Sequence, residues 1–69
     1  MQVGVIKWFN RVKGYGFIEP SDGSKDVFFH ISTLNAAGIR DIRENQAVSF
    51  QTEGHKGKIS AINIELIPY

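Results

Sequence analysis

Aromatic and basic residues that suit nucleic-acid chemistry gather in the segment Lys13-Gly14-Tyr15-Gly16-Phe17-Ile18. If this segment is a β-strand, its side chains alternate between two faces. Tyr15 and Phe17 then share one face with a cation, and the two glycines share the other with Ile18. Small and aliphatic residues suit a core, whereas rings exposed to water indicate a binding surface. Unpaired nucleobases have flat faces that stack on such rings, so the segment predicts a surface for nucleobases.

A second strand with the same arrangement is predicted at Asp26-Val27-Phe28-Phe29-His30-Ile31. Alternation puts Val27, Phe29 and Ile31 on a face that suits the core. Phe28 and His30 then lie on the opposite, exposed face. The two strands together predict a surface that carries several rings.

Other chemistry finds little support among the remaining polar residues. His30 and His55 lack any cysteine partner, and Asp26 is a poor third ligand, so we expect no metal site. The serines have no spaced base and orienting acid that would form a triad. The phosphate-binding motif G-x-x-x-x-G-K of an ATP-driven helicase is absent from the sequence. We therefore expect no catalytic residue, no cofactor and no small-molecule substrate.

Charge and aromatic residues are unevenly distributed along the 69 residues. The net charge is only +1, which argues against a protein that holds phosphates mainly by charge. The first 18 residues nevertheless contain Lys7, Arg11 and Lys13 and no acidic residue, and most of the aromatic residues precede residue 30. Cations and rings therefore concentrate in the same half of the chain.

Composition also limits the class of protein. The chain has no cysteine, no apolar run of the roughly 18 residues that a membrane span requires, and no signal-peptide pattern. We expect a cytoplasmic monomer without a membrane partner, folded as a single domain over residues 1–69.

Hydrophobic alternation and turn residues predict five short strands, over residues 3–9, 15–19, 26–31, 47–52 and 58–66. The first strand cannot direct all its apolar residues inward, so we expect a bulge there, and the pattern leaves open whether Trp8 or Phe9 faces outward. Ser32 is a candidate N-cap of one short helical turn, which a loop follows through Gln46.

These strands predict an all-β protein, a small five-stranded antiparallel barrel. Closing the sheet removes edges that would aggregate. The expected core consists of Ile6, Ile18, Val27, Phe29, Val48, Phe50, Ile62, Ile64 and Leu66.

Three motifs in this order resemble the bacterial cold-shock proteins: Lys7-Trp8-Phe9-Asn10, Lys13 to Ile18, and Asp26 to Ile31. The resemblance spans essentially the whole chain. It implies an OB-fold barrel that binds single-stranded RNA and DNA through surface aromatics and acts as an ATP-independent RNA chaperone and gene-expression regulator. The nucleic-acid-binding positions that it implies are Lys7, Trp8, Phe9, Asn10, Lys13, Tyr15, Phe17, Asp26, Phe28, His30 and Lys56.

Four positions depart from the usual pattern of the family. Tyr15 replaces the commoner Phe and keeps a ring, whereas Ile31 and Ile39 stand where many members have aromatic residues. Lys58 lies near a frequent Gly-Pro turn. Losing two stacking rings changes the expected affinity and footprint but leaves the type of ligand unchanged.

Two other classes of binding domain fit part of this sequence pattern. An RNA-recognition motif fits residues 13–17, but Pro20 stands where that motif has an aromatic residue, and the chain has no room for two long helices. A small barrel that binds proteins or peptides through the same aromatic face remains open, although the interleaved lysines suit phosphates better.

Overall fold

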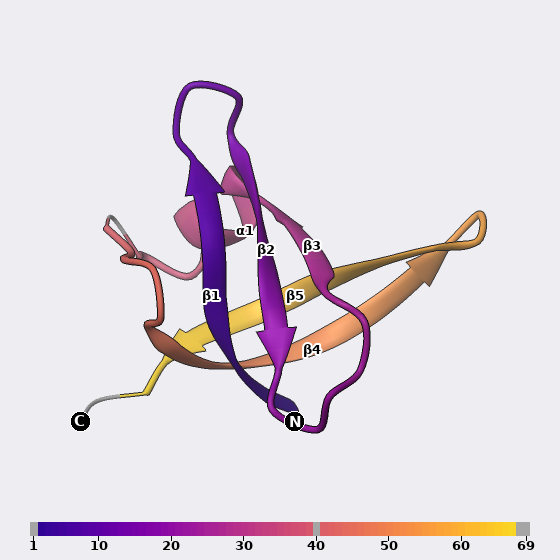
Figure 1. The fold of residues 1–69 in the computed structure, drawn as a ribbon. Coiled ribbons are helices and arrows are strands. Elements are labelled where there is room, and N and C mark those ends of the chain that lie inside the picture. Colours follow the sequence, from indigo (N-terminus) through magenta and orange to yellow (C-terminus); the bar gives the residue numbers. More distant parts are fainter. Residues whose placement is uncertain (1, 40, 68–69) are drawn as a thin grey trace.

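The fold is a closed β-barrel with one short helix, shown in Figure 1. The structure is a computed structural model, and it describes residues 2–39 and 41–67, apart from the His55 side chain. The elements are β1 (Gln2–Asn10), β2 (Tyr15–Pro20), β3 (Val27–His30), α1 (Ile31–Ala36), β4 (Ala47–His55) and β5 (Lys58–Leu66). Around the barrel the strands follow the order β1-β2-β3-β5-β4, which confirms the predicted five-stranded barrel.

One strand pair differs from the antiparallel prediction. The pairs β1–β2, β1–β4, β2–β3 and β4–β5 are antiparallel, but β3 and β5 run parallel and meet only through Phe28 and Ser60. The helix α1 and the long connection after it bring the chain round so that β4 pairs with β1. The next strand, β5, then reaches β3 in the same direction. We call this parallel junction the β3–β5 seam.

The bulge expected in the first strand is present at Lys7. Ile6 pairs with Ile18, but the next pair joins Trp8 to Phe17, so Lys7 is an extra residue in β1. An extra residue reverses the alternation that follows it. Ile6 and Phe9 therefore both point inward, and Trp8 points outward. The bulge decides the question that the sequence pattern leaves open.

The third strand is shorter than predicted, because a helix begins inside the expected range. β3 ends at His30, and Ile31 is the first residue of α1. The predicted N-cap, Ser32, is wrong: His30 has extended backbone dihedrals and accepts a hydrogen bond from the Ser32 backbone N–H through its ring. An imidazole nitrogen here takes the capping role that a hydroxyl usually has.

The predicted core residues of β1 to β4 are all buried, whereas those of β5 are buried only in part. Leu66 is 42% exposed and Ile62 only half-buried, whereas Ala61 and Ile64 are buried. Asn63 has a left-handed φ of 51°, and the register between β4 and β5 shifts beside it, so alternation along β5 breaks. Leu34 and Ile42, which the prediction did not include, also belong to the core. Its buried hydrophobic residues are Ile6, Ile18, Val27, Phe29, Leu34, Ile42, Val48, Phe50, Ala61 and Ile64.

The fourth and fifth strands form a hairpin that extends past the rest of the sheet (Figure 1). β4 continues to His55, three residues beyond its predicted end. Lys56 and Gly57 make the two-residue turn with positive φ values of 51° and 79°, the conformation of a type I′ turn. Beyond Phe50, β4 pairs with no described residue of β1, so in the described chain the outer part of the hairpin is a two-stranded ribbon.

Candidate nucleic-acid interface

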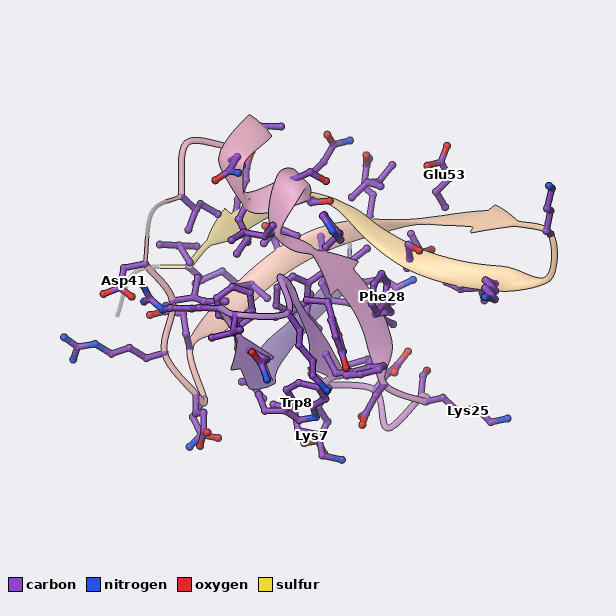
Figure 2. All side chains as sticks on the ribbon, turned by 90° about the horizontal axis from the view of Figure 1, so that it is seen from above. Lys7, Trp8, Lys25, Phe28, Asp41 and Glu53 are labelled. Carbon is purple, nitrogen blue, oxygen red and sulfur yellow. The ribbon has the colours of Figure 1, made fainter. Side chains whose placement is uncertain are left out.

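Four rings from three adjacent strands lie together on the outside of the barrel. Trp8 pairs with Phe17 across β1–β2, and Phe17 pairs with Phe28 across β2–β3. The ring centroids of Trp8 and Phe17 are 5.2 Å apart, those of Trp8 and Tyr15 5.6 Å, those of Tyr15 and Phe28 5.6 Å and those of Phe17 and Phe28 5.9 Å. We call Trp8, Tyr15, Phe17 and Phe28 the aromatic face; Trp8 and Phe28 are labelled in Figure 2.

The rings of the aromatic face support one another. Trp8 is 36% exposed, and the other three rings are half-buried, because each lies against the edge or the tilted face of its neighbour. Such edge-on contacts suit the quadrupole of aromatic rings and hold them in fixed orientations. The face is therefore a preformed platform whose outer surfaces remain accessible.

Gly16 allows the strands that carry these rings to approach closely. A Cβ atom at Gly16 would lie 2.5 Å from the Trp8 carbonyl oxygen and 2.7 Å from Cζ of Phe29. Neither backbone nor a buried ring can move far enough to accept it. Because Gly16 has no side chain, the Trp8 backbone and the buried Phe29 ring can both pack closely against it.

Two predicted site residues do not belong to the aromatic face. Phe9 points inward and stacks on Phe29 with centroids 5.8 Å apart and an angle of 16° between the rings. Asn10 shapes the β1–β2 loop, since its side-chain oxygen accepts from the Lys13 backbone N–H at 3.0 Å and its carbonyl from Gly14 N–H at 2.8 Å. The structure gives both residues positioning roles.

Lys7 and Asp26, predicted separately as site residues, form an ion pair beside the aromatic face. Lys7 Nζ donates to Asp26 Oδ2 at 2.9 Å, which joins the bulge of β1 to the start of β3. This hydrogen bond, with the attraction of the carboxylate, raises the pKa of Lys7. The sequence gives no signal for the pairing, because it depends on how the bulge of β1 lies in space relative to the start of β3.

The other two predicted cations of the site, Lys13 and Lys56, lie in loops between strands. Lys13 is exposed in the β1–β2 loop and makes no ion pair with any described residue, whereas Arg11 pairs with Asp41. Lys56 lies at the tip of the β4–β5 hairpin, in its turn. Lys13 is thus the free cation on the loop that joins the two strands bearing Trp8 and Tyr15.

His30 is exposed at the end of β3, opposite Tyr15 in register. Its Nδ1 accepts from the Ser32 backbone N–H at 3.1 Å and lies 3.0 Å from the Ser32 hydroxyl oxygen. A backbone N–H can only donate, so the neutral ring carries its proton on Nε2. His30 therefore presents a hydrogen-bond donor beside the rings. Ser32 positions it, and the only signal in the sequence was the spacing of a histidine and a serine at a strand end.

The two isoleucines at expected aromatic positions are not available for stacking. Ile31 lies over Gly14, where a Cβ atom would be 3.2 Å from Cγ2 of Ile31. Ile39 is half-buried against the core. The aromatic face therefore ends at Tyr15 on the side of the two isoleucines, and His30 lies beside it there.

Within residues 2–39 and 41–67, no group of three or more histidine, aspartate or glutamate side chains is placed to hold a metal ion. No helix in that part of the chain is long and apolar enough to cross a membrane.

Comparison with known proteins agrees with this geometry. The 'Cold-shock' DNA-binding domain matches residues 2–67. The chain is 46% identical over 67 residues to a probable cold shock protein of Sinorhizobium fredii, and the alignment covers 94% of this chain and 97% of that protein. It is 52% identical over 64 residues to the cold shock-like protein CspE of Buchnera aphidicola, which covers 91% and 93%.

A solved structure extends the agreement to the fold. The chain superposes on drosophila Unr CSD456 with a TM-score of 0.78 at 26% sequence identity, covering 97% of this chain and 26% of that one. The chain thus spans about a quarter of that protein's length. Family match, relatives and fold together lead to one conclusion: the chain belongs to the cold-shock domain family, a family of nucleic-acid-binding domains.

Proposed function

We propose that the protein binds single-stranded RNA and DNA as a monomer, by stacking successive bases on the aromatic face, and that it acts as an ATP-independent RNA chaperone and regulator of gene expression. The observation that carries this proposal is the outward position of four neighbouring rings, whose contacting pairs have centroids 5.2–6.4 Å apart. No core or fold requirement explains rings in that position.

Stacking supplies most of the binding free energy in this mechanism. A base on an aromatic side chain contributes roughly 1–3 kcal/mol, so three or four occupied rings give about 3–12 kcal/mol before ordering costs. A duplex hides its base faces in its own stack and cannot use these rings. Because every base has a face to stack, the preference among bases is weak.

Electrostatics contributes a smaller part. The net charge is +1, and Lys7 already has a carboxylate partner in Asp26. Lys13 and Lys56 are free to contact phosphates, and His30 offers its Nε2 proton to a base or a phosphate oxygen. Few charged contacts mean a shallow dependence of affinity on salt.

Chaperone activity follows from the same preference. A protein that binds only the open form of an RNA hairpin shifts the equilibrium towards that form by mass action and needs no nucleotide hydrolysis. The expected result is that excess protein separates the ends of a fluorophore- and quencher-labelled RNA hairpin without ATP.

Tryptophan fluorescence tests the binding mode directly, because Trp8 is the sole tryptophan of the chain and belongs to the aromatic face. Titration with heptathymidine should quench Trp8 emission to saturation, and a duplex of matched length should not. Equal responses to both, or no response to either, would refute the proposal. An acidic peptide that quenches as well as heptathymidine would instead favour a protein-binding role for the same face.

A further inference from the structure

The aromatic face does not end at β3, because a hollow continues from it across the β3–β5 seam. This hollow of about 420 Å³ is lined by Phe17, Asp26, Phe28, Lys58, Ile59 and Ser60. Its first side belongs to the aromatic face, and its second side belongs to β5. Ile59 is 61% exposed and offers an apolar wall opposite the rings.

A second hollow continues the first one. It has a volume of about 520 Å³ and lies between the β2–β3 loop, with Ser24 and Lys25, and the β4–β5 hairpin, with Gly57. Asp26 and Ile59 line both hollows, so the two adjoin each other, and we call them together the groove between Phe28 and the hairpin turn. Figure 2 shows Lys25 extending from its loop on the side towards which the hairpin projects.

The charges along this groove favour an anionic occupant. Of the two acidic residues in its lining, Asp26 is paired with Lys7 at 2.9 Å, whereas Asp22 accepts only from the Ser24 backbone N–H and hydroxyl, at 2.9 and 2.5 Å, and keeps its negative charge. With Lys7 included, the ammonium groups of Lys7, Lys25 and Lys58 outnumber these two carboxylates. In the described part of the chain, Lys25 and Lys58 form no ion pair. The exposed carboxylate of Glu53 belongs to the same hairpin but lines neither hollow.

The two ends of the aromatic face therefore differ. On the side of Ile31 and Ile39, no ring lies beyond Tyr15 among the described residues, because both positions carry isoleucine. On the side of β5 there is a groove with two free ammonium groups, although sequence alternation gives no reason to connect Lys25 with Lys58. The parallel pairing of Phe28 with Ser60 brings them to the same groove.

We propose that a polynucleotide chain bound on the aromatic face continues across the β3–β5 seam into this groove, where Lys25 and Lys58 contact its phosphates and Ile59 contacts a sugar or base. The inference rests on the proposed function and adds a second binding segment to it. The groove extends the footprint towards the hairpin, at the end opposite the positions where Ile31 and Ile39 replace aromatic residues.

The test compares a short and a long ligand at two salt concentrations. Tetrathymidine is sufficient for the rings of the aromatic face, and decathymidine is long enough to enter the groove as well. Each phosphate contact to a single strand adds about 0.7 to the slope of log affinity against log salt, so two contacts make decathymidine lose about sevenfold more affinity than tetrathymidine between about 50 and about 200 mM salt. Trp8 fluorescence reports both titrations.

The double variant Lys25→Ala/Lys58→Ala should lose this additional salt dependence and should bind tetrathymidine as the parent protein does. Arg43→Ala is the matched control: it removes an exposed cation before β4, at the opposite end of that strand from the hairpin, and should leave the difference between the ligands intact. Thermal melting verifies that the surface variants are folded.

The outcomes separate this inference from the proposed function. If tetrathymidine binds but decathymidine shows no additional salt dependence, the groove is unused and the inference is wrong while the proposed function stands. The inference is equally wrong if Arg43→Ala removes the difference as well as the double variant does, because general electrostatics then explains it. If tetrathymidine and decathymidine both fail to bind, the proposed function itself fails.

Discussion

Phe28 and Phe29 are consecutive residues of β3 that point to opposite sides of the barrel. Phe28 lies on the aromatic face, whereas Phe29 is fully buried and stacks on Phe9. Their different surroundings make the pair a test of what each side of the sheet does.

Phe28→Ala should weaken heptathymidine binding by about 1–3 kcal/mol, because one stacking surface is lost. Its cost in folding free energy should be about 1 kcal/mol, since the ring is only half-buried and lies outside the core. Phe29→Ala is the control and should destabilise the fold by about 3–5 kcal/mol. Fluorescence titration and urea unfolding measure the two effects. Unfolding of the Phe28 variant at the level of the Phe29 variant would contradict the assignment of faces.

The ion pair of Lys7 with Asp26 predicts a dependence of stability on pH at the alkaline end. The bond to Asp26 raises the pKa of Lys7 in the folded state above its unfolded value of about 10.4. The pair therefore stabilises the fold fully below about pH 10.4 and loses this contribution as pH rises through the folded pKa. Melting temperatures of the parent protein should fall more steeply from pH 10 upwards than those of Asp26→Asn. Parallel curves for the two proteins would show that the pair contributes nothing.

At the scale of the strands, close approach of β1 and β2 depends on Gly16. Gly16→Ala should destabilise the fold by about 1–3 kcal/mol, because the new methyl group meets the Trp8 carbonyl and the Phe29 ring within 2.7 Å. Gly54→Ala is the matched control in β4, where the nearest atom would be 3.9 Å away and φ is not positive. This change should stabilise the protein by about 0.4–1 kcal/mol through the unfolded chain. Urea unfolding compares both variants with the parent, and a Gly16 variant as stable as the parent would overturn this explanation.

Alternation predicts most of the sheet, and it fails where one residue breaks the period. In β2 and β3 the faces of Phe17 and Phe28 are as expected, because both strands are short and regular there. In β5 the prediction of a buried Ile62 is wrong and Ala61 is buried instead, because Asn63 adopts a left-handed φ that no apolar pattern encodes. The register of β5 against β4 determines which β5 residues face the core.

The site follows the same rule. Rings on regular strands are predictable from parity, whereas partners such as Lys7 with Asp26, or His30 with Ser32, depend on a bulge and a helix start. The groove past the β3–β5 seam cannot be predicted from alternation, because it is formed where residues of two loops meet a parallel strand pair.

For the whole molecule, a small core makes ligand binding easy to detect as stability. The protein has ten buried apolar residues in the described chain, so its unfolding free energy is modest. Heptathymidine at one hundred times its Kd should stabilise the folded state by about 2.7 kcal/mol and raise Tm by about 10–20 °C. A duplex at the same concentration should leave Tm unchanged. A shift of equal size with the duplex would mean that binding does not depend on exposed bases.

The barrel is closed along one line by a single residue pair, Phe28 with Ser60. Local unfolding selects the places with the fewest hydrogen bonds, so amide protons on either side of that line should exchange with solvent at a lower free energy than those between β1 and β2. A nucleic acid that crosses the line would tie its two sides together. Binding a longer strand would then slow hydrogen exchange there and would turn the least stable closure of the molecule into one of its most protected regions.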